Sequence, residues 1–376
     1  MSSLTRIALV GLIMVAVIAG CGDDKGTQPI GSAWNMRLIG SYDTPGTARG
    51  VFVTDDYAYV ADQSSGLQII DITDPGRPTL AGSLDTPGRA CGLYVDTLAY
   101  WVYVADCSLY AVDTICVDCS HYVFDTNYAD CRHYVYDTLY VVDTLVYVAD
   151  YSSGPYIIDV TNPDNLVDVG DYETLGWARG IFVVGNLAYV VDYGDGLKIV
   201  DMTDRAFPSL AGSYDTPGRA RGVHVDGNYA YVADEYGGLQ IIDVADSANP
   251  TVAGSYDHDS LSIAYGVYVA GNYAYIADYY LGLQIIDITD PTHPTRAGGY
   301  ATPGHARSVF VAANYAYVAD EYSGLQVIDI SDPASPTLVG YYETAGSGYT
   351  EGVFVTEEYV YLTDTDLGLL ILEFVP

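Results

Sequence analysis

The chain has 376 residues, 50% of them hydrophobic, and carries a net charge of −35 from 49 acidic and 14 basic residues. Such an acidic chain lacks the basic surface that nucleic acid requires, and anionic lipid would repel it. We therefore expect neither a nucleic-acid partner nor docking on a bare membrane surface. The excess of carboxylates favours solubility, with calcium binding as the alternative, and no other metal or cofactor is expected.

The N-terminal residues have the pattern of an export signal. After the charged Arg6 comes an uncharged apolar run, residues 7–20, which is too short to cross a bilayer comfortably. The small residues directly before Cys21 resemble the lipobox of bacterial lipoproteins, and the resemblance implies cleavage before Cys21 and a lipid on its sulfur. An ordinary signal peptide with an incidental cysteine is the alternative. We expect a signal peptide over residues 1–20, a flexible tether over residues 21–34, and a bacterial membrane lipoprotein on the periplasmic or cell-surface side.

Residues 35–376 repeat one phrase, of which residues 59–75 hold a complete copy. The phrase reads Tyr-Val-Ala-Asp, then Gly-Leu-Gln-Ile-Ile-Asp, then a turn with Thr-Asp-Pro. A period in the low forties, built of short β-branched and aromatic runs between Gly, Pro and Asp, is typical of propeller blades. The sequence therefore predicts a closed all-β propeller, and counting the aspartates that end the first part gives eight four-stranded blades. These aspartates lie 42 or 44 residues apart, at Asp62, Asp106, Asp150, Asp192, Asp234, Asp278, Asp320 and Asp364.

One unit, residues 50–84, shows how four antiparallel strands arise. Apolar runs separated by turn residues predict strands at 50–53, 57–61, 67–72 and 78–84. The second run alternates large and small side chains, which predicts a half-buried strand. The aspartate that ends the third strand is expected to cap the backbone amides of the following turn. It recurs as Asp71, Asp159, Asp201, Asp243, Asp287 and Asp329.

The two ends of the repeat array predict ring closure. Residues 36–42 form a fourth strand with no blade before them, and residues 369–373 end the last blade at its third strand. Pairing the two completes the ring and removes a bare sheet edge. The third-strand phrase resembles the LVIVD repeat of bacterial and archaeal exported propellers, and the resemblance implies a propeller fold but no catalytic residues. It is carried by residues 67–71, 197–201, 239–243, 283–287 and 325–329.

The repeat decays in residues 91–150, where a twelve-residue echo replaces it. Because the spacing of two full units is kept, we interpret this stretch as two degenerate blades, with seven blades and a looped-out segment as the alternative. Disulfides are the default for cysteines of an exported protein, but their odd number here leaves at least one free or paired elsewhere. A zinc site is the alternative, because the echo places Cys119 near His121 and Cys131 near His133, but tandem duplication explains the same spacing. The cysteines of this stretch are Cys91, Cys107, Cys116, Cys119 and Cys131.

Four arginines share one position of the repeat, at the start of the strand predicted to be innermost: Arg49, Arg179, Arg221 and Arg307. A partial arginine ring at the channel mouth would bind carboxylates, phosphates or acidic sugars. The alternative is structural, because the hairpin places each arginine beside the repeat aspartate, as Arg49 beside Asp62. Arginine–aspartate pairs that brace the blades would explain both positions together.

Departures from the repeat are the better indicators of function, because a recognition surface needs asymmetry. Three loops before innermost strands differ from the usual Asp-Thr-Pro-Gly, and they contain Trp177, His258 and Tyr349. Tyr265 and Glu351 replace the arginine at its position in the repeat. These five residues are the candidate recognition surface. We find no nucleophile elbow, phosphate loop or zinc-protease helix. We expect a cell-envelope binding or scaffold module for an envelope protein or glycan. The alternative is an enzyme acting on a polysaccharide or small substrate, with His258 or Glu351 as its catalytic group.

Overall fold

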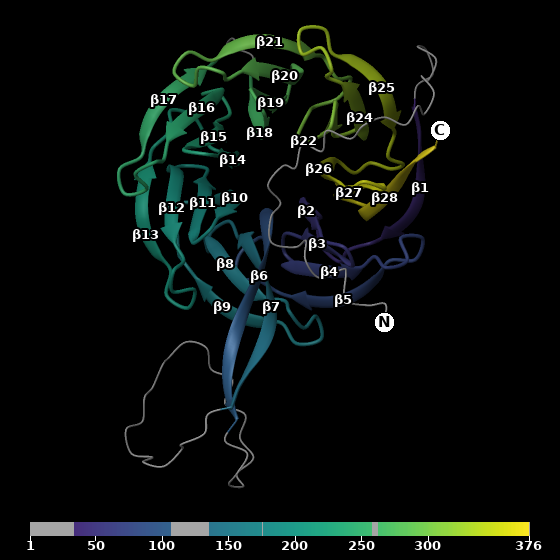
Figure 1. Cartoon of the computed structure of the whole chain (residues 1–376). Helices are drawn as coiled ribbons and strands as arrows, with labels where there is room; N and C mark the ends of the chain where they lie inside the picture. Colours follow the sequence, from purple (N-terminus) through teal and green to yellow (C-terminus); the bar gives the residue numbers. More distant parts are fainter. Residues whose placement is uncertain (1–33, 107–134, 175, 258–261, 376) are drawn as a thin grey trace. The chain divides into compact units, whose positions relative to one another are not determined.

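The computed structural model describes residues 34–106, 135–174, 176–257 and 262–375, and the regular structure within these ranges is β-strand throughout (Figure 1). Five sheets have four strands each, and one sheet has eight. In blades 1 to 6 the strand order in the sheet follows the chain, so each connection is a short antiparallel turn or a longer hairpin, whereas the outermost strand of blade 7 comes from the N-terminal end of the described chain.

The blades are numbered from the N-terminal side. Blade 1 consists of β2 (Gly50–Val53), β3 (Tyr57–Ala61), β4 (Leu67–Asp71) and β5 (Thr79–Leu84). Blade 2 consists of β6 (Gly92–Asp106), β7 (Val135–Ala149), β8 (Pro155–Asp159) and β9 (Val167–Asp171). Blade 3 consists of β10 (Ala178–Val184), β11 (Leu187–Asp192), β12 (Gly196–Asp201) and β13 (Ser209–Tyr214). Blade 4 consists of β14 (Gly222–Asp226), β15 (Tyr229–Ala233), β16 (Leu239–Asp243) and β17 (Thr251–Tyr256).

The remaining blades include the junction of the two chain ends. Blade 5 consists of β18 (Ala264–Ala270), β19 (Tyr273–Asp278), β20 (Gly282–Asp287) and β21 (Thr295–Tyr300). Blade 6 consists of β22 (Ser308–Ala312), β23 (Tyr315–Ala319), β24 (Leu325–Asp329) and β25 (Thr337–Tyr342). Blade 7 consists of β26 (Thr350–Val355), β27 (Tyr359–Asp364) and β28 (Gly368–Val375), completed by β1 (Trp34–Tyr42).

The N-terminal strand closes the last blade, as the ends of the repeat array predict. β1 pairs antiparallel with β28, from Asn35 opposite Val375 to Tyr42 opposite Leu369. It also pairs in parallel with β25 at Trp34 and Gly340, which joins blades 6 and 7 into the eight-stranded sheet. The first strand of the array thereby covers an edge that would otherwise be open.

The prediction of eight blades is wrong: the propeller has seven. The sequence predicts the strands before Asp106 and Asp150 to be the second strands of two degenerate blades, but they belong to β6 and β7, which are neighbours in a single sheet. Asp106 is therefore the last residue of β6, and the aspartate that follows the second strand of this sheet is Asp150. The described residues 97–106 and 135–144, which are parts of β6 and β7, are grouped in a second compact unit. The insertion in blade 2 thus has the length of one repeat. For this reason, counting aspartates at repeat spacing gives one blade too many.

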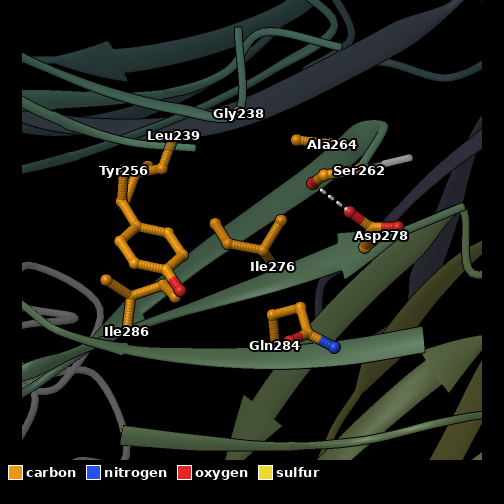
Figure 2. Close-up of a pocket in the computed structure, with 9 residues that line it drawn as sticks. All are labelled: Gly238, Leu239, Tyr256, Ser262, Ala264, Ile276, Asp278, Gln284 and Ile286. Atoms are coloured by element: carbon orange, nitrogen blue, oxygen red, sulfur yellow. Dashed lines mark hydrogen bonds between the residues drawn. The ribbon is translucent and has the colours of Figure 1, made fainter. Parts of the chain in front are cut away.

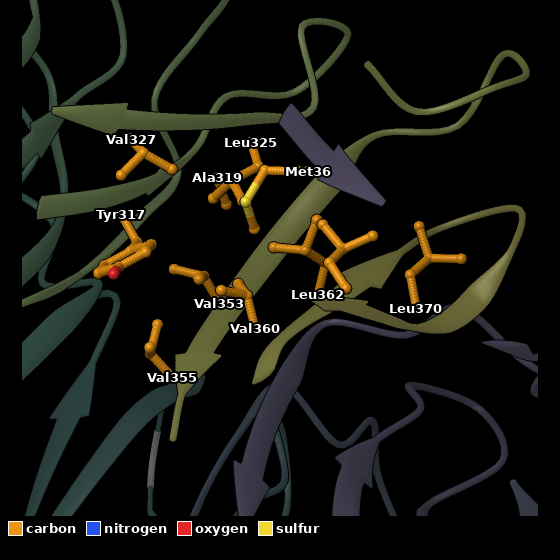
Figure 3. Packing of buried hydrophobic residues seen from close by; sticks show 11 residues of the cluster. Met36, Tyr317, Ala319, Leu325, Val327, Val353, Val355, Val360, Leu362 and Leu370 are labelled. Carbon is orange, nitrogen blue, oxygen red and sulfur yellow. The ribbon is translucent and has the colours of Figure 1, made fainter. Parts of the chain in front are cut away.

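The core of the propeller lies between blades. Figure 3 shows the layer between blades 6 and 7, where Tyr317 and Leu325 face Val353 and Leu362, with Met36 from β1 added at its edge. Burying a side chain of this size stabilises the fold by about 1.5–3 kcal/mol. The same kind of layer recurs between other blades, for example between blade 1 and blade 2.

The prediction of half-buried second strands is wrong, because neighbouring blades cover these strands on both faces. Residues 58–61 of β3 are at most 3% exposed, including both the tyrosine and the alanines. A blade between two neighbours has no solvent face in its middle strands: Tyr59 and Ala61 pack toward blade 2, and Ala58 and Val60 pack toward blade 7.

The aspartate at the end of each third strand caps the next turn, as expected. In blade 1 the Thr73 backbone N–H donates to Asp71 Oδ1 at 2.9 Å, and the Thr73 hydroxyl donates to the same oxygen. The same contact recurs at Asp159, Asp201, Asp243, Asp287 and Asp329. These carboxylates are exposed and serve the turns on the face opposite the arginines.

Of the cysteines, Cys91 lies in the described part of the chain, and it is free. Cys21, Cys107, Cys116, Cys119 and Cys131 lie outside the described residues, as do His121, His133 and His258. The predictions of lipidation, disulfides and a zinc site made from them are not tested.

Candidate functional site

One face of the propeller is organised by the aspartate that ends each second strand. In blade 1, Asp62 is fully buried and accepts hydrogen bonds from the Thr44 hydroxyl at 2.8 Å and the Gly46 backbone N–H at 2.7 Å. Thr and Gly of the Asp-Thr-Pro-Gly loop are thus the two donors that bind this carboxylate. The loop entering each innermost strand and the loop after the second strand therefore lie together on this face.

The same arrangement recurs at Asp150, Asp234 and Asp320. In the deviating loop of blade 3, Asp192 instead accepts from the backbone N–H groups of Gly176 and Trp177. The prediction that these aspartates pair with the arginines is therefore wrong. Their oxygens are occupied by nearby loop donors, and the long arginine side chains reach other partners.

Seven residues, one per blade, lie where the innermost strands begin; we call them the mouth ring. Neighbouring strands approach closely at this level: a Cβ on Gly352 would lie 2.6 Å from the carbonyl oxygen of Arg49, so glycine is required there. Figure 1 shows the innermost strands nearest the centre of the propeller. The mouth ring consists, in blade order, of Arg49, Cys91, Arg179, Arg221, Tyr265, Arg307 and Glu351.

Two ring arginines are bound by glutamates. Arg307 Nε donates to Glu321 Oε1 at 2.6 Å, and His305 Nδ1 lies 2.7 Å from the other carboxylate oxygen. Arg221 makes the same pair with Glu235. Each glutamate directly follows a buried repeat aspartate, a position that sequence reasoning passed over. Burial lowers the pKa of Arg307, but its acidic neighbours outweigh that effect and raise it.

Arg49 is also fully engaged. Its Nη1 donates to Glu351 Oε1 at 3.0 Å, across the junction of the first and last blades. With its amide oxygen facing Arg49, Gln63 accepts from Nε at 2.7 Å and from Nη2 at 2.9 Å. Glu351 therefore serves as an ion-pair partner within the ring, which is a poor arrangement for a free catalytic acid.

Arg179 differs from the other three. Among the described residues its guanidinium has no hydrogen-bond acceptor and no carboxylate partner, and its Nε is buried. Its neighbours are aromatic: Cζ lies 5.0 Å from the ring centre of Tyr151 and 5.2 Å from that of Tyr193. Trp177 stacks between the same two tyrosines, at 5.0 and 5.5 Å.

Aromatic side chains cover the rest of this face. Tyr265 packs on the guanidinium groups of Arg221 and Arg307, with Cζ distances of 4.0 and 4.7 Å. The Tyr322 hydroxyl donates to that of Tyr349 at 2.7 Å. Of the predicted candidates, the structure thus places Trp177, Tyr265 and Tyr349 on one face with the four arginines. The most exposed aromatics here are Trp177, Tyr236, Tyr280 and Tyr322, with 45–60% of each residue accessible.

Three residues beyond the mouth ring, each innermost strand contributes an aromatic side chain to a closed girdle around the centre of the propeller. Successive ring centroids are 4.7–5.6 Å apart. Burial lowers the pKa of the one histidine, His224, to about 4, so it is neutral at physiological pH. The girdle consists of Phe52, Tyr94, Phe182, His224, Tyr268, Phe310 and Phe354.

Two aspartate-rich loops, residues 192–196 and 364–368, use their first carboxylate on their own backbone. Asp192 accepts from Gly194 N–H, and Asp364 accepts from Asp366 and Leu367 N–H. In the described part of the chain, no group of three or more His, Cys, Asp or Glu side chains has the arrangement of a metal site.

A small cavity between blades 4 and 5 is not a good ligand site (Figure 2). Its lining is largely apolar, with Leu239, Ile276 and Ile286 among its residues. Its Asp278 carboxylate accepts from the Ser262 hydroxyl at 2.5 Å and from backbone N–H groups, so it offers no free polar group. The mouth face is the better candidate.

The LVIVD repeat profile matches once in each blade, at residues 45–86, 138–174, 175–216, 217–258, 263–302, 303–344 and 347–373. The chain belongs to the LVIVD-repeat family. The second match begins at residue 138, which leaves residues 87–137 outside the repeats and agrees with an insertion in blade 2. Seven matches and seven sheets together correct the count of eight.

Solved structures share the fold at low sequence identity. The β-propeller domain of Cps50 (Swd1) from Myceliophteria thermophila has a TM-score of 0.63 and 11% identity, with 91% of this chain and all of that chain covered. The computationally designed Ika8 protein has a TM-score of 0.57 and 8% identity, with the same coverage. No curated protein matches the chain. Within the described residues, no helix has the length and apolar character to cross a membrane.

Proposed function

We propose that this propeller is a binding or scaffold module that recognises its ligand with the mouth face. The observation that carries the proposal is the distribution of the basic residues. In a chain with 14 Lys and Arg and 49 Asp and Glu, six arginines occupy two repeat positions on this face. They are Arg49, Arg89, Arg179, Arg219, Arg221 and Arg307.

Aromatic side chains support the same surface as an interaction site. Exposed tyrosine and tryptophan combine a large contact area with a polar tip, and they are enriched with arginine in binding hot spots. Tyr280 and Tyr322 project from adjacent blades 5 and 6 and are 56% and 59% exposed. A protein or a glycan of the cell envelope is the partner class that we propose for this surface.

A pull-down on purified envelope material tests this proposal. Residues 22–376 contain every strand of the structure and would be sedimented with isolated envelopes and with purified cell-wall glycan. We expect the double variant Tyr280→Ala and Tyr322→Ala to lose binding by about tenfold or more. Phe207→Ala is the matched control, because Phe207 is 79% exposed in a turn on the opposite face. Unchanged binding by the tyrosine variant, or loss with Phe207→Ala, would contradict the proposal.

We propose further that the protein is held at the envelope by a lipid on Cys21. The support is the coincidence of a charged start, an apolar run and small residues directly before a cysteine. In a bacterial host fed a fatty-acid analogue, the wild-type chain should be labelled and remain with membranes. Cys21→Ser should abolish the label and release the protein, and a labelled Cys21→Ser protein would refute the anchor.

A further inference from the structure

We propose that Arg179 is the anchoring residue of the mouth face, and that it binds the carboxylate of a small organic acid. The inference rests on the proposed function, because it concerns the same surface, and it adds the anchor and the ligand class. It follows from the charge, the hydrogen bonding and the shape around one guanidinium.

Charge singles out Arg179 within the mouth ring. In blades 4 and 6, a glutamate follows the buried repeat aspartate and neutralises the ring arginine, whereas the equivalent residue in blade 3 is Tyr193. Among the described residues, no carboxylate therefore neutralises Arg179. The other three arginines have a carboxylate partner each: Arg49 with Glu351, Arg221 with Glu235, and Arg307 with Glu321.

The next ring position does not supply the missing negative charge. Cys91 is the neighbour of Arg179 on the blade 2 side, and it is uncharged as a thiol. Burial raises the pKa of this thiol, against the opposing effect of Arg179 and Arg49. No described residue accepts a hydrogen bond from the Arg179 guanidinium, and because its Nε is buried, the two terminal nitrogens are the donors left for a ligand.

The surrounding rings favour a flat anion. Cζ of Arg179 lies 5.0 Å from the ring centre of Tyr151 and 5.2 Å from that of Tyr193, so two aromatic rings border the guanidinium. A planar carboxylate can accept two parallel N–H bonds in the plane of the guanidinium. A tetrahedral phosphate would direct its remaining oxygens toward the rings. Trp177, 45% exposed beside the same tyrosines, offers an apolar edge to the body of the ligand.

Calorimetric titration of residues 22–376 with four probes tests the inference. D-glucuronate and benzoate share the carboxylate but differ in the rest of the molecule, D-glucose lacks the charge, and inorganic phosphate has the wrong shape. We expect at least one carboxylate to bind with a Kd below about 1 mM, and glucose and phosphate to bind at least about tenfold more weakly. Tighter binding of glucuronate would indicate a sugar-acid ligand, and tighter binding of benzoate an aromatic acid.

Three variants identify the residue responsible. Arg179→Gln should weaken carboxylate binding at least about tenfold. Arg179→Lys should recover part of the affinity, because it keeps the charge without the planar pair of donors. Arg77→Gln, in an exposed turn on the opposite face, should leave affinity unchanged. Thermal melts would confirm that each variant is folded.

Several results would overturn the inference. They are equal binding of phosphate and carboxylate, no carboxylate binding, and unchanged affinity in a folded Arg179→Gln protein. None of these would affect the envelope pull-down, which depends on Tyr280 and Tyr322, so failure of the anchor and failure of the proposed function can be told apart.

Discussion

Phe52 in the first blade and Phe354 in the last blade pack against each other with ring centroids 4.9 Å apart. They are 302 positions apart in the chain, and their contact completes the aromatic girdle of the channel. The girdle is therefore a second closure of the propeller, in addition to the pairing of β1 with β28.

Phe354→Ala should destabilise the propeller, because it removes a side chain in contact with rings from both neighbouring blades. We expect a loss of about 2 kcal/mol, below the range for a fully buried Phe because Phe354 is partly exposed. Urea unfolding would measure the change. Phe207→Ala, at a site 79% exposed, should change stability by less than about 0.5 kcal/mol. Similar losses in the two variants would show that the girdle does not stabilise closure.

A chain that begins at Asp43 lacks β1 and should be much less stable than one that begins at Trp34. Its absence exposes the edges of β28 and β25 and removes Met36 from the layer in Figure 3. We expect a loss of more than about 4 kcal/mol and self-association through the bare edges. Thermal melts and size-exclusion chromatography would show both effects. A monomeric truncated protein with an unchanged melting temperature would contradict this role of β1.

His224→Phe should make the protein less sensitive to mild acid. The pKa of His224 is lowered to about 4 in the folded state, against 6.5 for an unperturbed His. The unfolded chain therefore binds the proton more readily, and this histidine costs stability as the pH falls below about 6.5. Between pH 7 and pH 5, His224 lowers the free energy of unfolding by about 2 kcal/mol, and the variant should not show this loss. Denaturant unfolding at both pH values would reveal the difference, and parallel profiles would refute it.

Asp234→Asn should have the opposite effect on the pH profile. Burial raises the pKa of Asp234 from 3.8 to about 6, so the folded state binds the proton more tightly than the unfolded chain does. As the pH falls through 6, protonation of Asp234 therefore raises the free energy of unfolding, by about 2 kcal/mol near pH 4.5 relative to pH 7.

The same titration series provides the control for Asp234→Asn. The variant should be less stable at pH 7, because one of the donors from Thr216 and Gly218 loses its acceptor, and it should gain less on acidification. Asp55→Asn, in an exposed turn, should keep the wild-type profile. High salt would screen the self-repulsion of the acidic chain in all three proteins. An unchanged slope for Asp234→Asn would show that this aspartate does not titrate in the window.

The local structure of the regular blades could be predicted from sequence, because each turn and strand carries its own signal. Asp71 with Thr73 is such a case, since capping needs residues only two positions apart. The arginine partners could not be predicted in the same way. Arg49 pairs with Glu351 from the opposite end of the chain, and Asp62 is satisfied by a threonine hydroxyl and a backbone amide in a neighbouring loop.

The sequence by itself determined the propeller fold, the order of strands in a blade and the closing role of the first strand. These follow from apolar periodicity and turn chemistry, which act over a few residues and repeat along the chain. Only the tertiary structure decided the number of blades, because β6 and β7 pair across an insertion whose length imitates a repeat. It also decided that, within the described part of the chain, Arg179 is the ring arginine without an acidic partner, because charge compensation depends on which side chains meet across blades.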